Sequence, residues 1–160
     1  MRKIIFRGRR IGTGEWVRGG IAPAYHAAED PMEPDRQEGY SILADGRAYA
    51  VDQDTIGQYT GMDDKAGNPI FEDDLVTTTH FDGEGVIRGR VRFGPHAANM
   101  SQQHVCQGFW IEWAADEFLR KELGFWRERL TVMTPWAENP RLWDRWCEEA
   151  AALERARQDS

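Results

Sequence analysis

The sequence contains few cysteines: Cys106 and Cys147 are the only two among 160 residues. Two cysteines this far apart provide no disulfide framework, and such scarcity is typical of a reducing cytosol. No stretch approaches the roughly 20 apolar residues that a membrane-spanning helix needs. The basic start "MRKIIFRGRR" has too short an apolar run for a secretory signal. We therefore expect a soluble intracellular protein with no membrane contact.

Positive charge is also scarce, because 20 Lys and Arg stand against 27 Asp and Glu, giving a net charge of −7. This balance argues against broad, non-specific coating of DNA, although a local basic patch stays open. Internal repeats and low-complexity tracts are lacking. Aromatic residues are plentiful instead: seven Trp, seven Phe and four Tyr. We expect them to dominate the core or an interface.

The first 50 residues have the pattern of β-hairpins. One hairpin is expected over residues 3–21, with its turn at Gly12–Gly14, and a second around the Asp45-Gly46 dipeptide between apolar runs. Residues 22–39 lack a clear period and carry three prolines, so they predict a loop or mobile excursion. Residues 1–50 are thus expected to form an N-terminal hairpin region.

The rest of the chain predicts a barrel-like or sandwich-like β unit over residues 51–140. Short strands are expected at residues 56–62, 69–71, 74–81, 85–93, 109–113 and 129–133. A polar loop is expected at residues 94–108. The stretch 114–126 is expected to contain a short helix that ends at Gly124. Asn139 and Pro140 are suited to begin a C-terminal amphipathic helix, which continues over residues 141–160 and packs on the β unit. The fold class is mainly β, on the margin of α+β.

Four blocks of sequence resemble the YopX family of small proteins encoded by bacteriophages and prophages. They are "FRGRR" (residues 6–10), "GEWVRG" (14–19), "IGQYTGMDDKAGNPIFEDDLV" (56–76) and "AENPRL" (137–142). One departure is Asp73, at a position where the family has Gly, which argues against a tight turn there. The resemblance implies a largely β protein that self-associates, and a phage or prophage origin would place it in the cytoplasm of a bacterial host cell. It brings no catalytic residues and no cofactor.

The long block contains five acidic residues, which raise the question of a catalytic or metal site. They are Asp63, Asp64, Glu72, Asp73 and Asp74. Two converging carboxylates would suit Mg²⁺, so a metal-assisted hydrolase is one hypothesis. Turn chemistry accounts for most of them more simply, because short polar side chains hydrogen-bond to nearby backbone N–H groups. We therefore expect a structural role and assign no catalytic residue.

Histidines offer a second metal hypothesis, which the spacing does not favour. His96, His104 and Cys106 fall in one predicted loop, and His80 lies elsewhere. A structural zinc site usually has two close pairs of ligands, and the sequence has no second pair. Nothing in the sequence positions Cys106 for nucleophilic catalysis either. We expect no metal and no cofactor.

The candidate binding residues are three arginines on one predicted strand and two tryptophans on the last helix. Arg88, Arg90 and Arg92 recur with period two and share a face, while Ile87, Val91 and Phe93 are expected to point inward. The arginines would suit a phosphate backbone or an acidic protein, or would form a solvated outer face. Trp143 and Trp146 would pack on the β unit or anchor a second subunit. A non-enzymatic protein that binds a protein or itself is the leading hypothesis, and nucleic-acid binding through the arginine strand is the alternative.

Overall fold

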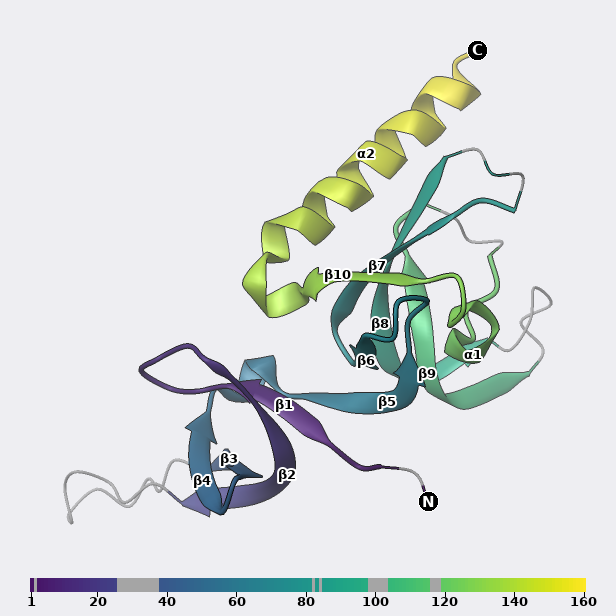
Figure 1. Ribbon diagram of the computed structural model, residues 1–160. Helices are drawn as coiled ribbons and strands as arrows, with labels where there is room; N and C mark the ends of the chain where they lie inside the picture. Colours follow the sequence, from purple (N-terminus) through teal and green to yellow (C-terminus); the bar gives the residue numbers. More distant parts are fainter. Residues whose placement is uncertain (2, 26–37, 82, 84, 98–103, 116–118) are drawn as a thin grey trace. The chain divides into compact units, whose positions relative to one another are not determined.

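The computed structural model describes residues 1, 3–25, 38–81, 83, 85–97, 104–115 and 119–160 (Figure 1). The chain divides into two compact units, residues 1–61 and residues 62–160. Its fold is mainly β, as the sequence predicts, with two antiparallel sheets and, in the described part, two α-helices. Neither of these helices has the length and hydropathy to span a bilayer.

The first unit is built from antiparallel hairpins. Its elements are β1 (Phe6–Arg9), β2 (Trp16–Tyr25), β3 (Glu38–Ala44), β4 (Arg47–Val51), the short 3-10 turn η1 (Gln53–Thr55) and the start of β5 (Gly57–Asp63). The strands lie in the order β4-β3-β2-β1-β5. They curl strongly, because Arg10 also forms a β-bridge with Val51.

Both predicted hairpins of this unit are confirmed. Residues Asp45 and Gly46 turn between β3 and β4 with φ values of 50° and 73°, the left-handed conformation that a two-residue hairpin requires. The loop expected over residues 22–39 is too long at both ends: residues 22–25 belong to β2 and residues 38–39 to β3. Backbone pairing between the two strands there overrides their poor periodicity, and residues 26–37 lie outside the described residues.

The second unit contains the remaining elements. These are the end of β5, β6 (Pro69–Phe71), β7 (Asp74–Thr79), β8 (Val86–Ala97), β9 (Val105–Trp113), α1 (Leu123–Trp126), β10 (Thr131–Pro135), the 3-10 turn η2 (Trp136–Glu138) and α2 (Pro140–Gln158). Four strands form a sheet in the order β10-β7-β8-β9, and β6 pairs with the end of β5. The arrangement is sandwich-like, and the barrel-like alternative is not found in the described chain.

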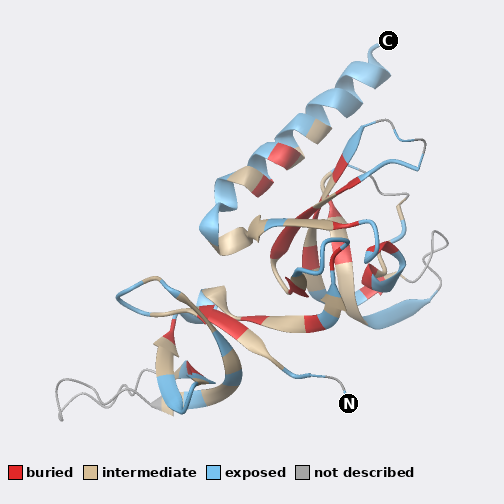
Figure 2. Cartoon of the chain, in the orientation of Figure 1, coloured by how far each residue is buried: buried red, intermediate tan, exposed pale blue. Residues whose placement is uncertain are grey.

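The main core of this unit lies on one face of the four-stranded sheet. Val76, Val91 and Ile111 on the sheet contact Ile70 of β6 and Trp126 of α1, and all are fully buried. Figure 2 shows buried residues, in red, along the strands of this sheet and in α1. Gly89 of β8 faces the same core. A Cβ placed there would lie 2.5 Å from Cγ2 of Ile111 and 2.9 Å from Cε3 of Trp113, so the neighbouring side chains already fill the space.

Helix α2 covers the opposite face of the sheet through its first turns. Trp143 and Trp146, 9% and 6% exposed, form a second core cluster with Leu75 of β7. Pro140 is the first helical residue and Asn139 precedes it, as the sequence predicts, although the Asn139 side chain makes no capping hydrogen bond. The later turns leave the sheet, and Leu153 is 66% exposed (Figure 2).

The β8–β9 hairpin is longer than the sequence predicts. The loop expected at residues 94–108 is wrong at its ends, because the strands stay paired as far as Ala97 and Val105; residues 98–103 lie outside the described residues. Pro95 is tolerated because the β7–β8 register stops at Arg90, so its missing N–H costs no pairing with β7. Phe93 was expected inward but is 52% exposed, because it lies beyond the stretch that the core covers and packs edge-on against Phe109 instead.

The internal helix is much shorter than predicted. Helix α1 spans only Leu123–Trp126, and Gly124 lies inside it rather than ending it. The residues before it are held as extended chain: the N–H of Ile111 donates to the Lys121 carbonyl, and the indole N–H groups of Trp113 and Trp126 both donate to the Arg120 carbonyl. These tertiary bonds take carbonyls that a helix would use. Residues 116–118 of the expected helix lie outside the described residues.

Candidate binding surface

The acidic segment is organised around Asp64, at the start of the turn between β5 and β6. Asp64 is 6% exposed, and its carboxylate accepts hydrogen bonds from the N–H groups of Ala66 (2.9 Å), Asn68 (2.8 Å) and Val132 (3.0 Å) and from the Asn68 side chain (3.2 Å). Burial alone would raise the pKa of this carboxyl, but the hydrogen bonds outweigh it and lower the pKa. Asp64 therefore ties the β5–β6 turn to β10.

Asp74 also serves the backbone. It is the first residue of β7 and is fully buried, and one carboxylate oxygen accepts a hydrogen bond from the N–H of Phe71 at 2.8 Å, which is the kind of structural role expected for the acidic block. In the described chain, no three His, Cys, Asp or Glu side chains gather to hold a metal ion. Asp64 and Asp74 are thus engaged with backbone N–H groups, which leaves them poorly placed to act as paired catalytic carboxylates.

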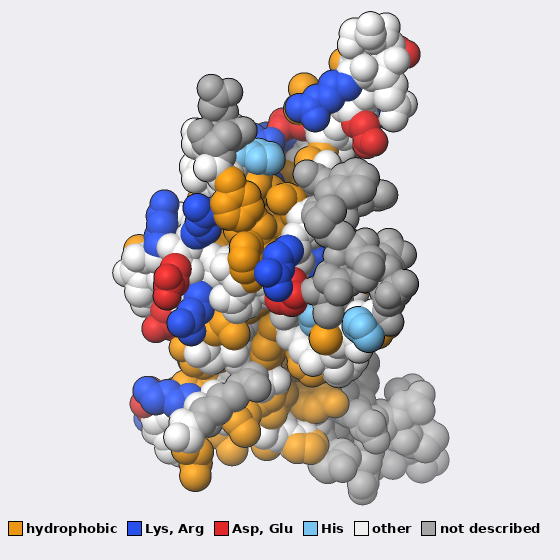
Figure 3. Space-filling view, turned by 90° about the vertical axis from the view of Figure 1, so that its right-hand side faces the viewer, with side chains coloured by type: hydrophobic (Ala, Val, Ile, Leu, Met, Phe, Trp, Pro, Cys, Tyr) orange, Lys and Arg blue, Asp and Glu red, His pale blue; other side chains and the backbone are white. Residues whose placement is uncertain are grey.

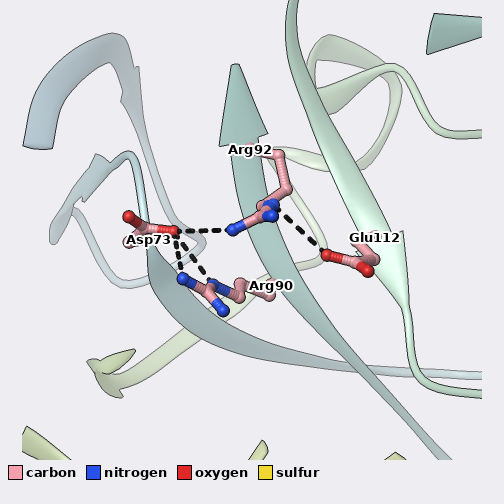
Figure 4. Close-up of polar contacts among 4 residues, drawn as sticks. All are labelled: Asp73, Arg90, Arg92 and Glu112. Carbon is pink, nitrogen blue, oxygen red and sulfur yellow. Dashed lines mark hydrogen bonds and ion pairs between the residues drawn. The ribbon is translucent and has the colours of Figure 1, made fainter. Parts of the chain in front are cut away.

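The arginine strand is paired with carboxylates of its own unit (Figure 4). Arg90, whose side chain is 12% exposed, contacts Asp73 with Nε at 2.9 Å and Nη2 at 2.8 Å. Arg92 bridges Asp73 at 3.4 Å and Glu112 at 3.3 Å. The guanidinium of Arg90 also lies 4.2 Å from the ring centroid of Trp136. These arginines share a face, as predicted, but that face is lined with acids and aromatic rings.

The third arginine contacts helix α2. Arg88 pairs with Glu149 at 2.6 Å and lies 5.6 Å from the ring centroid of Trp146. The two sets of candidate binding residues therefore meet each other: the tryptophans pack on the sheet face that carries the arginines. A phosphate backbone on this strand would have to replace the three carboxylates that the arginines now contact.

A groove of about 820 Å³ lies within the first unit, beside the Gly12–Gly14 turn. Arg9, Arg10 and Asp52 line it. Arg10 pairs with Glu15 at 2.7 Å and stacks over Tyr49 at 4.6 Å, so its charge is already offset. The charged side chains that line the groove are of both signs, Arg9 and Arg10 against Asp52, and we assign no ligand to it.

A second surface, in the second unit, joins residues that the sequence patterns did not bring together. Phe81 follows β7 and Phe125 belongs to α1; they are 58% and 42% exposed, and their ring centroids are 6.1 Å apart. The guanidinium of Arg129 lies 4.3 Å from the Phe81 centroid, and that of Arg120 lies 4.5 Å from the Phe125 centroid. We call these four residues the Phe81–Phe125 surface. Figure 3, which views the side that carries α1, shows hydrophobic side chains with Lys and Arg beside them.

A comparison with protein-family models decides the relationship that the sequence blocks suggest. The model described as YopX protein matches residues 26–134, more than half of the chain. The chain belongs to the YopX family. A comparison with curated proteins gave no match. The role of the YopX family is uncharacterised, so its name adds no activity.

The YopX match contains the most specific of the four blocks, residues 56–76, whereas the other three lie outside the matched range. In the structure this block supplies β5, β6, the start of β7 and the turns between them. The tight turn at Asp73 is present, contrary to our expectation from the missing Gly. Asp73 adopts φ 63°, a left-handed conformation that Asp tolerates better than most residues. Its side chain then reaches the two arginines of β8.

Proposed function

We propose that this YopX-family protein is a phage or prophage accessory protein that acts by binding a protein, without catalysis. The Phe81–Phe125 surface is the observation that carries the proposal. Two large apolar rings lie side by side in water, and each has an arginine against it. Phe and Arg are enriched at protein interfaces, and aromatic side chains dominate their binding energy.

The contacts that the Phe81 and Phe125 rings already make favour a protein partner over nucleic acid. A base that stacks on Phe81 or Phe125 needs an open ring face. A guanidinium already covers one face of each ring, and both rings contact Trp126 at 5.2 Å between centroids. The net charge of −7 supports the same choice.

The test is capture of a partner by tagged full-length chain from host cells carrying the phage or prophage, followed by mass spectrometry. Three baits are compared: wild type, the double variant Phe81→Ala/Phe125→Ala, and Phe93→Ala. Phe93 is the matched control, because it is an exposed phenylalanine of the same unit, 52% exposed. The tryptophan emission of each bait checks that it is folded.

We expect wild type and Phe93→Ala to retain the same protein and the double variant to lose it. Sedimentation of the three baits shows whether that protein is a second copy of the chain, which would also satisfy the proposal. If all three folded baits retain the same proteins in the same amounts and sediment alike, the proposal is wrong.

A further inference from the structure

We infer that the Phe81–Phe125 surface takes an acidic peptide segment that carries an apolar side chain. The inference rests on the proposed function and adds the chemistry of the partner. Two properties of the surface support it: the rigidity of its aromatic part and the surplus charge beside it.

The aromatic part of the surface packs on a buried tryptophan. Trp126 is fully buried, and its indole N–H donates to the Arg120 carbonyl at 2.7 Å. Phe81 and Phe125 both lean on this tryptophan, with centroid distances of 5.2 Å and inclined planes. The exposed rings are therefore already positioned when a partner arrives, and little side-chain entropy is lost on binding. An apolar side chain that covers them removes their exposed area from water.

The charge beside the rings is positive. Two arginines near the surface have a carboxylate within reach: Arg120 with Glu122 at 3.0 Å and Arg127 with Glu128 at 3.6 Å. Arg129 is exposed and forms no ion pair with any residue of the described chain. Its guanidinium sits over Phe81, so a carboxylate that pairs with it lies next to the apolar contact. The partner that satisfies both features has an acidic residue adjacent to an apolar one.

The negative net charge of the chain does not oppose this local pairing. Charges separated by more than about 8 Å are largely screened at physiological ionic strength. The charges nearest the rings decide the encounter. Among the described residues these include Arg129, which has no ion-pair partner there, and Arg120, whose side chain is 51% exposed and pairs with Glu122. A carboxylate that replaces Glu122 on Arg120 would extend the contact along the surface.

The experiment selects peptides from a random displayed library on immobilised full-length chain. The most enriched peptide is then labelled and titrated by fluorescence anisotropy against wild type, Phe81→Ala, Arg129→Glu and the control Phe93→Ala. We expect enriched peptides with Asp or Glu beside Phe, Trp, Leu or Ile. We also expect each of the two surface variants to weaken binding by about tenfold or more, as for an interface hot spot, and the control to bind like wild type.

Several results would overturn the inference. These are enrichment of neutral or basic peptides, no enrichment at all, equal binding by all four proteins, or displacement of the peptide by oligo(dT) or by a second copy of the chain. Tryptophan emission shows whether a variant that binds weakly is folded. If Arg129→Glu does not fold, Arg129→Gln provides a milder replacement. If the partner capture depends on Phe81 and Phe125 but the selected peptides are not acidic, only the inference fails and the proposed function stands.

Discussion

Replacing Asp64 by Asn tests the structural role of the acidic block. Asn has nearly the same shape but carries no charge, and its amide group places donors where the carboxylate accepted. One Asn oxygen can keep the bonds from Ala66 and Asn68, whereas the N–H of Val132, 3.0 Å from Oδ2, would then face a second donor. Losing that bond and the charge assistance of the others costs about 2–4 kcal/mol.

Urea unfolding followed by tryptophan emission measures this loss, because six of the seven tryptophans lie in the second unit. With a slope of about 1.5 kcal/mol per molar urea, a loss of about 2–4 kcal/mol should lower the midpoint by about 1.3–2.7 M. Asp144→Asn is the matched control: the same change on an exposed residue of the same unit. If both variants unfold at the wild-type midpoint, Asp64 does not hold β10 to the turn.

The pH dependence of the same variant gives a second readout. The pKa of Asp64 is lowered in the folded state, so its stabilisation is complete above the pKa of the unfolded chain and is lost as pH falls through the folded pKa. Asn resembles the protonated acid. We therefore expect the difference in unfolding free energy between wild type and Asp64→Asn to shrink as the solution is acidified. A difference that stays constant down to strongly acid pH would contradict this assignment.

Three further predictions concern other parts of the second unit. Gly89→Ala should lower the unfolding free energy by about 1–3 kcal/mol, because the added methyl group overpacks the core. Gly124→Ala should not, because a Cβ there lies 3.7 Å from its nearest neighbour, Cε of Met62. Equal unfolding midpoints of the two variants in urea would refute this. Asp73→Gly should be more stable than Asp73→Ala by about 1 kcal/mol, because both lose the ion pairs but only Gly relaxes at φ 63°. Iodoacetamide should label exposed Cys106 well before Cys147, because burial raises the pKa of the Cys147 thiol, aided by nearby carboxylates. Mass spectrometry at timed intervals measures both rates, and similar rates would contradict the assignment.

Local patterns in the sequence predict much of the fold. Alternation and turn residues locate the hairpins, and Asp45-Gly46 and Pro140 have the conformations that their chemistry favours. Local patterns do not predict the structure where groups distant in sequence form the hydrogen bonds. The expected helix before Gly124 is extended instead, because β9 and two indoles use its carbonyls.

The candidate site is less predictable than the fold. Period two places Arg88, Arg90 and Arg92 on one face, and this is correct, but it does not reveal what covers that face. Arg88 pairs with Glu149, 61 residues away, so the answer depends on how α2 packs. The Phe81–Phe125 surface also depends on tertiary structure. It joins the end of one strand to a four-residue helix, and neither segment has an unusual pattern of its own.

The most direct measurement is the amount of partner that each bait retains from host cells carrying the phage or prophage, with Arg92→Ser added to the three proteins already described. Arg92 is the most exposed of the three arginines, at 39% of its side chain, so its loss should leave the fold intact. We predict that the partner is lost with Phe81→Ala/Phe125→Ala and is retained with Arg92→Ser. Retention by the phenylalanine variant together with loss by Arg92→Ser would place binding on the arginine strand and contradict the account.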